Sequence, residues 1–163
     1  MKALAAALLL ATPAAAQDDG AFVTFQVLKP ELALQMAEAA MESCRDAGYQ
    51  VGVTVVDRFG LPQVFLRDRY AGAHVFETSR RKAWTAASFR TPTADLAAST
   101  APGEPASAIR QPSEALPLGG GLPVMEGGGG LVAGIGVSGA PGPDLDAICA
   151  QAGIDAIADE IAF

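Results

Sequence analysis

Hydrophobic and polar residues alternate along this chain with two different periods, which together predict its secondary structure. From Glu31 to Ala47, small and apolar residues recur three and four positions apart, as on one face of an α-helix. Pro30 occupies the favoured first position of this helix, and Gly48 is the expected stop. The following segment, Gln50–Asp57, is almost wholly apolar and β-branched, which is typical of a central strand.

The rest of the chain repeats this alternation of strands and helices. Residues Asp57–Gly60 predict a turn, so Leu61–Arg67 is expected to return beside the first strand as a hairpin. The later elements are expected in this order: a helix over Val75–Phe89, a short helix over Ala94–Ala98 with Thr93 as its cap, a long loop over Ser99–Pro117, a strand around Leu122–Met125, a turn over Gly127–Gly130, a strand over Leu131–Ser138 and a closing helix that begins at Pro143.

Two hairpins separated by helices predict an α/β protein with a mostly antiparallel sheet against which the helices pack. The length of the chain suits one domain with a core of its own, which we place over residues 30–163. Residues 17–29 before it are expected to be an N-terminal extension. Because Ala21–Leu28 is rich in β-forming residues, a short strand is the alternative for this segment.

The first sixteen residues have the three parts of a secretory signal peptide. A positive charge at Lys2 precedes an apolar run, Ala3–Ala11, and small residues lead to a cleavage site after Ala16. The run is about ten residues long, whereas a membrane-spanning helix needs roughly 20. A buried N-terminal helix is the alternative. We therefore expect a mature chain of 147 residues (163 minus 16) that is periplasmic or secreted.

The charge balance excludes some classes of partner. Acidic residues outnumber basic ones by 18 to 11, and loss of Lys2 with the signal peptide would take the net charge from −7 to −8. A protein this acidic is poorly suited to binding nucleic acid. No further apolar run of about 18 residues follows the signal peptide, so we expect no membrane span.

The chain has two cysteines, Cys44 and Cys149. In an oxidising compartment an even number of cysteines favours a disulfide. Each of the two also falls on the apolar stripe of its predicted helix, so the alternative is a pair of small buried hydrophobic residues.

A glycine pattern near the end of the chain invites comparison with dinucleotide-binding loops. Gly134, Gly136 and Gly139 fit the spacing G-x-G-x-x-G. However, the first two lie inside the predicted strand, and residues 140–143 separate the pattern from the helix that should follow at once. We therefore expect no NAD site, and we interpret the glycines as allowing close approach of strand and helix or as leaving room for a flat ligand.

Basic residues are concentrated in one short stretch of this acidic chain. Six of the eleven fall within 24 positions, and the only histidine, His74, lies among them. The six are Arg67, Arg69, Arg80, Arg81, Lys82 and Arg90. They can form a solvated helix face, an oligomer contact, or an anion site in which arginine pairs with ligand carboxylates. A histidine in such a site can also ligate a metal ion.

Four segments, taken in order, resemble the GlcG/HbpS family of small haem-binding proteins, which also forms the C-terminal domain of PduO-type proteins. Together they extend over nearly the whole expected mature chain. They are the Ala-rich helix that runs into Val51–Gly60, the segment Ser79–Ala86 close to the family's K-A-x-T-A helix, the segment Gly120–Val124 close to its G-G-x-P-I strand, and Gly134–Gly139 followed by Asp144–Asp146 and Cys149–Gly153.

This resemblance implies an α/β/α sandwich of the profilin-like kind, with helices on both faces of the sheet, often assembled into homo-oligomers. It also implies haem binding, and exported members are associated with extracellular haem sensing or protection. Some members use a histidine of the first helix for haem iron, whereas this first helix has none. We therefore expect His74 to be the iron ligand, with Arg67, Arg69 or Lys82 near the haem propionates and Thr85 in the binding segment.

The leading hypothesis is an exported small-ligand-binding protein that binds haem without catalysis of its own. No nucleophile–base pair stands out, so an enzyme is not favoured. Two alternatives stay open. One is a binding or accessory protein for a small organic acid of the glycolate type, since some family members are linked to glycolate-utilisation operons. The other is a purely oligomeric domain that docks a protein partner.

Overall fold

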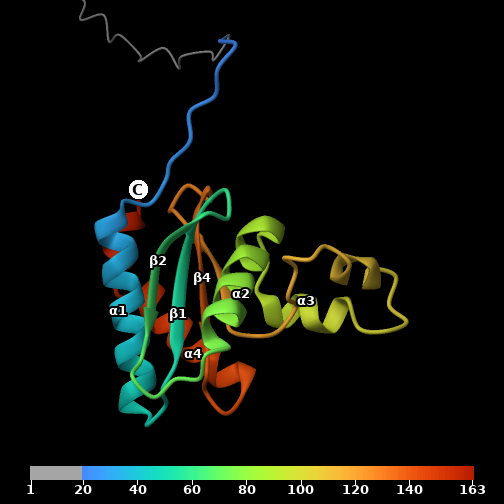
Figure 1. The fold of residues 1–163 in the computed structure, drawn as a ribbon. Helices are drawn as coiled ribbons and strands as arrows, with labels where there is room; N and C mark the ends of the chain where they lie inside the picture. The colour runs from blue at the N-terminus through green and yellow to red at the C-terminus, as the bar shows by residue number, and fades with distance from the viewer. Residues whose placement is uncertain (1–19) are drawn as a thin grey trace, which may run out of the picture.

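The periodic segments fold into helices and strands close to their predicted bounds (Figure 1). The computed structural model describes residues 20–163, so the predicted signal peptide at residues 1–16 lies outside the described residues. None of the helices in this described part has the length and apolar character that crossing a membrane requires. The elements follow in this order: α1 (Pro30–Asp46), β1 (Gly52–Asp57), β2 (Pro62–Arg67), α2 (Val75–Phe89), α3 (Thr93–Ser99), the 3-10 helix η1 (Ser107–Arg110), β3 (Gly121–Met125), β4 (Leu131–Ser138), α4 (Pro143–Asp155) and the 3-10 helix η2 (Ala158–Ile161).

The four strands form one antiparallel sheet with the order β2-β1-β4-β3. β1 pairs with β2 as the predicted hairpin and with β4 on its other side, while β3 and β4 form the second hairpin. β4 is buried at every position, and β1 is buried at all but its last. A strand that is covered on both faces needs apolar side chains on both, which explains why these two segments show no alternation in the sequence.

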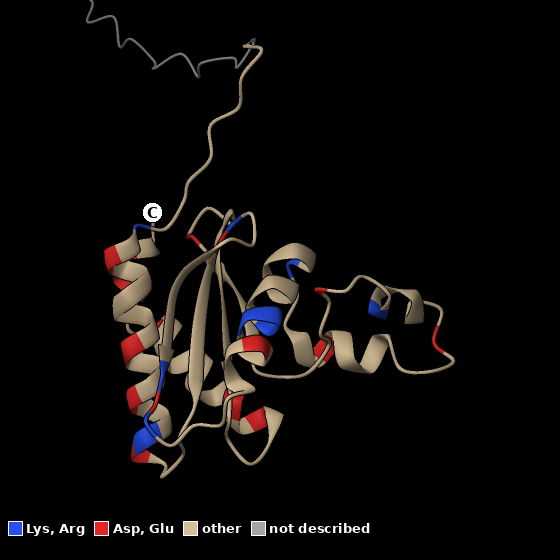
Figure 2. Cartoon of the chain, viewed as in Figure 1, with Lys and Arg blue, Asp and Glu red and all other residues tan. Residues whose placement is uncertain are grey.

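Helices cover both faces of this sheet. α1 and α4 pack together on one face, and α2 covers the other, chiefly over β4 and β1. The α/β/α sandwich that the family resemblance implied is therefore confirmed. The main hydrophobic core lies between the sheet and the α1–α4 layer, where Met36 and Met41 of α1 are buried. The acidic residues of α1 occupy its exposed positions instead (Figure 2).

The close packing of α2 on β4 depends on two glycines of the strand. A Cβ atom at Gly136 would collide with the backbone carbonyl oxygen of Ser79, and one at Gly134 would lie 2.7 Å from the carbonyl oxygen of Ala83. Because Cβ atoms do not approach oxygen so closely, the helix backbone can rest on the strand only where side chains are missing. The close-approach interpretation of the glycine pattern is confirmed.

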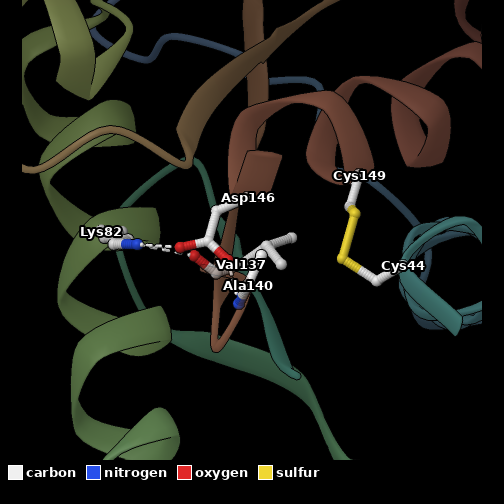
Figure 3. Close-up of a disulfide and its surroundings, with 6 residues drawn as sticks. All are labelled: Cys44, Lys82, Val137, Ala140, Asp146 and Cys149. Atoms are coloured by element: carbon white, nitrogen blue, oxygen red, sulfur yellow. Dashed lines mark hydrogen bonds and ion pairs between the residues drawn. A yellow bond between two sulfur atoms is a disulfide. The ribbon is translucent and has the colours of Figure 1, made fainter. Parts of the chain in front are cut away.

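A disulfide joins the two helices of the α1–α4 layer. Cys44 of α1 and Cys149 of α4 are bonded, with their Cα atoms 5.5 Å apart (Figure 3). Both residues lie on the buried faces of their helices, so the bridge is inside the core. Of the two expectations for these cysteines, the bridge is the correct one.

One alternative and one detail of the sequence prediction are wrong. Ala21–Leu28 is an extended segment and not a strand: its last residue donates one backbone hydrogen bond to β4, while most of its large apolar side chains are exposed. β-forming residues make a strand only where a partner strand is available. Thr93 does not cap α3, because its hydroxyl donates instead to the carbonyl oxygen of Leu118 and so ties α3 to the segment before β3.

Loss of the disulfide should weaken the fold without changing it. The bridge joins residues 105 positions apart, and in the chain-entropy model a loop of that size contributes about 4.7 kcal/mol. We expect the double variant Cys44→Ala, Cys149→Ala to lose about 2–5 kcal/mol of unfolding free energy, measured by urea denaturation. A reducing agent should destabilise the parent and leave the double variant unaffected. Equal stability of the two proteins would contradict this role for the bridge.

Candidate functional site

One face of α2 points toward the end of β4 and the start of α4. His74, Thr78 and Lys82 follow one another at intervals of four residues, a spacing that places side chains in a row along a helix. His74 immediately precedes the first residue of α2, and Lys82 lies about 12 Å further along the helix axis. This row of side chains forms one wall of a cavity.

The cavity has a volume of about 280 Å³ and lies where the amino-terminal ends of α2 and α4 approach the end of β4. The N–H groups at the start of a helix carry partial positive charge, and two such ends meet here. Lys82 and Asp146 of the lining balance each other's charge, so the two helix ends are what favours a negatively charged group here. The lining consists of His74, Thr78, Lys82, Leu118, Ser138, Asp146 and the residues 139–143 that lead into α4.

A buried ion pair forms the floor of the cavity. Nζ of Lys82 donates to Oδ2 of Asp146 at 2.8 Å and to the carbonyl oxygen of Val137 at 2.9 Å (Figure 3). The other carboxylate oxygen of Asp146 accepts a hydrogen bond from the backbone N–H of Ala140 at 3.0 Å. Since the Lys82 side chain is only 1% exposed, the pair ties α2 to β4 and α4 inside the protein.

Burial favours the neutral form of each member of this pair. Loss of water raises the pKa of Asp146 and lowers the pKa of Lys82. Their mutual hydrogen bond and the attraction between their charges oppose both shifts. Because the contact is short and each partner makes a further hydrogen bond, we assign the ionised pair at neutral pH.

A glycine makes room for the ion pair. Gly120 has a φ of +107°, a conformation that side chains rarely adopt. A Cβ atom there would lie 3.0 Å from Nζ of Lys82 and 2.7 Å from Cβ of Asp146. Both the backbone conformation and the space therefore call for glycine at this position.

Two hydroxyl groups line the same cavity as the ion pair. Oγ1 of Thr78 is 2.7 Å from Oγ of Ser138, the last residue of β4, and 3.0 Å from the carbonyl oxygen of His74. A hydroxyl has one proton to donate and can accept others. When Thr78 donates to Ser138, the proton of Ser138 is free to serve a ligand.

Of the residues predicted for a binding site, the structure brings His74 and Lys82 together at this cavity. Arg67, at the end of β2, lines a different cavity beside Glu38 and other residues of α1. Arg69 is exposed on the connection that follows β2. The two arginines therefore do not line the cavity on which His74 lies.

Other members of the basic cluster, together with Thr85, hold the long loop against α2. Arg80 forms an ion pair with Glu114, and Arg81 donates to carbonyl oxygens of the same loop. The hydroxyl of Thr85 accepts a hydrogen bond from the N–H of Leu116 at 2.8 Å. Lysine and arginine positions are spread over several elements (Figure 2), so these residues serve the fold and do not gather around the cavity.

Sequence reasoning missed three polar side chains of the cavity. Thr78 was detectable, because it lies midway between His74 and Lys82 at helical spacing on a helix that the sequence predicted. Ser138 and Asp146 come from other elements, and no local pattern indicates that the end of a strand and the first turn of a later helix meet at Lys82.

The fold and the cavity define a small α/β/α domain that offers an anion-favouring cavity at one end of its sheet. A family model described as "Haem degrading protein HbpS-like" matches residues 28–155. The chain therefore belongs to the HbpS-like family, as the four ordered segments of its sequence indicated.

Solved structures agree with this assignment. HbpS of Streptomyces reticuli, solved as a double mutant, is 40% identical, with 90% of this chain and 97% of its own covered and a TM-score of 0.79. The ORFY protein of Klebsiella pneumoniae is 27% identical, with coverages of 84% and 94% and a TM-score of 0.80. PduOC, solved as a complex with haem, is 29% identical, with coverages of 80% and 95% and a TM-score of 0.74. No curated protein matches the chain.

Removal of one member of the buried ion pair should destabilise the fold more than removal of both. Asp146→Asn leaves the Lys82 ammonium buried without its counter-charge, which costs about 3–5 kcal/mol in comparable sites. The double variant Lys82→Met, Asp146→Leu removes both charges and should recover much of that loss. Urea denaturation measures both, with Asp159→Asn on the exposed end of the chain as control. A single variant as stable as the control would contradict the assignment.

Proposed function

We propose that this protein is an exported haem-binding module with His74 as the ligand for haem iron. The observation that carries the proposal is the place of His74: the only histidine of the chain lies on a cavity that favours anionic groups. Membership of the HbpS-like family and the haem complex of the relative PduOC support the choice of haem.

The residues that line the cavity suit the binding of one edge of a haem group. Imidazole is a common axial ligand, and the macrocycle brings the other iron ligands with it. A haem iron therefore needs only one ligand from the protein. This requirement suits the site, since no group of three or more metal-ligating side chains converges within residues 20–163. At about 280 Å³ the cavity is slightly smaller than the lower limit of about 300 Å³ for small-molecule sites. It can take one edge of the macrocycle, while the rest would lie outside the cavity.

Haem, when bound, supplies an iron centre and propionate side chains that carry negative charge. His74 is exposed, so its imidazole can reach a ligand without rearrangement of the core. The amino-terminal ends of α2 and α4 favour negative charge deeper in the cavity. The proposed role is binding without catalysis, for sensing, carriage or protection of haem.

Titration of the purified protein with haemin tests this function. We expect a shifted Soret band that saturates and keeps its intensity over hours, because haem is bound and not broken down. His74→Ala should abolish or displace the shifted band, whereas Gln111→Ala, an exposed change on the long loop, should leave it as in the parent. An unchanged spectrum for His74→Ala would contradict the ligand assignment. Progressive bleaching of the band would contradict binding without catalysis.

A free small organic acid is the second candidate ligand. The size of the cavity and the two helix ends that open on it favour such an acid, which needs no iron ligand. Thermal stabilisation by glycolate, together with an unshifted haemin spectrum, would favour this candidate over haem.

We further propose that the protein is exported and assembles with copies of itself. The signal-peptide features of residues 1–16 support export, and the family resemblance supports a homo-oligomer. Native mass spectrometry of protein collected from the periplasm or medium measures both properties. We expect a subunit that lacks the first 16 residues and an assembly that is a whole multiple of it. A full-length subunit retained in the cytoplasm would contradict export, and a monomer would contradict assembly.

A further inference from the structure

We infer that the floor of the cavity is a carboxylate site, in which a ligand carboxylate accepts one hydrogen bond from Nζ of Lys82 and one from Oγ of Ser138. The inference rests on the proposed function for haem as the carrier of the carboxylate. A free organic acid presents the same group, so the chemistry of the site is shared by both candidate ligands.

Lys82 has one unused donor. A lysine ammonium carries three N–H groups, and two of them are taken by Asp146 and by the carbonyl oxygen of Val137. The side chain is 1% exposed, so a ligand can approach the third N–H only from the cavity that Lys82 lines. Because Lys82 lines the cavity, the third N–H is left for whatever fills it.

Ser138 provides a second donor from a different element. It ends β4, lines the same cavity and is buried. The hydroxyl of Thr78 lies 2.7 Å from its oxygen and 3.0 Å from the carbonyl oxygen of His74, and its single proton serves Ser138 at the shorter of these two contacts. With Thr78 as its donor, Ser138 can direct its own proton into the cavity that Lys82 also lines.

The charges around these two donors suit an anion with a single charge. Lys82 and Asp146 neutralise each other, and the amino-terminal ends of α2 and α4 add partial positive charge. Asp144, in the first turn of α4, adds negative charge close to Asp146. Both aspartates would repel a dianion such as phosphate more strongly than a carboxylate, which carries one charge and offers two oxygens to the two donors.

This site differs from the arginine cluster that the sequence suggested for anion binding. Arg80 and Arg81 are bonded to the long loop, and Arg67 lines another cavity. The basic group that meets the ligand is instead the ammonium of Lys82, which the ion pair with Asp146 already holds in position. Little side-chain freedom is then lost on binding, which favours affinity.

Haemin and its dimethyl ester distinguish the carboxylate site from iron ligation, because the ester keeps the iron and the macrocycle but has no free carboxylate. We expect the parent protein to bind haemin about tenfold more tightly than the ester, the loss expected for a charge-assisted hydrogen bond. Ser138→Ala should weaken haemin binding several-fold and leave the ester unchanged. The control Ser99→Ala, an exposed serine at the end of α3, should change neither. Soret titrations measure all affinities.

The possible results separate this inference from the proposed function. Equal affinities for haemin and the ester would overturn the carboxylate site and leave haem binding intact. If neither binds, haem binding fails, and acetate and glycolate at constant ionic strength become the probes. Thermal stabilisation of the parent but not of Ser138→Ala would then support the site with a free acid as its ligand. Stabilisation of neither protein, or of both equally, would overturn it.

Discussion

The approach of α2 to β4 is the contact on which the site depends. At Gly134 and Gly136 the helix backbone rests directly on the strand, nearer than side chains would permit. This closeness allows Lys82 to reach the carbonyl oxygen of Val137 and the carboxylate of Asp146, which belongs to the layer on the opposite face of the sheet. If α2 lay one side chain further away, the ammonium would be buried without its partners, a state that proteins avoid.

As a result, α4 is attached to both α2 and α1. Asp146, in its first turn, is paired with α2, and Cys149, one turn later, is bonded to α1 (Figure 3). The amino-terminal end of α4, which forms part of the cavity wall, is thereby fixed relative to both helical layers. A disulfide of this kind persists in oxidising compartments, so the same helix carries the bridge that suits export and a wall of the candidate binding site.

Most of the fold was predictable because its strongest signals are local. The periodicity over Val75–Phe89 matches α2 residue for residue, and the apolar runs locate the two central strands. Ala21–Leu28 was predicted less well, because strand formation depends on a partner edge that its own residues do not reveal.

The site was less predictable, because a cavity between elements is defined by tertiary contacts. His74 and Lys82 were found by residue type, but Asp146 lies 64 positions from Lys82 along the chain. The concentration of arginines in the sequence did not indicate where the cavity lies. Arg80 is close to Lys82 in sequence but faces Glu114 of the long loop, and this ion pair is visible only once the chain is folded.

The cavity is assembled from α2, the segment before β3, the end of β4 and the start of α4, so it exists only when the layers of the sandwich are in place. A ligand in it would bind the folded chain and not the unfolded one. By thermodynamic linkage, a free ligand concentration one hundred times its Kd adds about 2.7 kcal/mol to the free energy of unfolding. That is within the range of roughly 2–5 kcal/mol that a native disulfide contributes. Occupancy would therefore hold the layers together about as strongly as the covalent bridge does, and the resistance of the protein to unfolding would report how much ligand its surroundings contain.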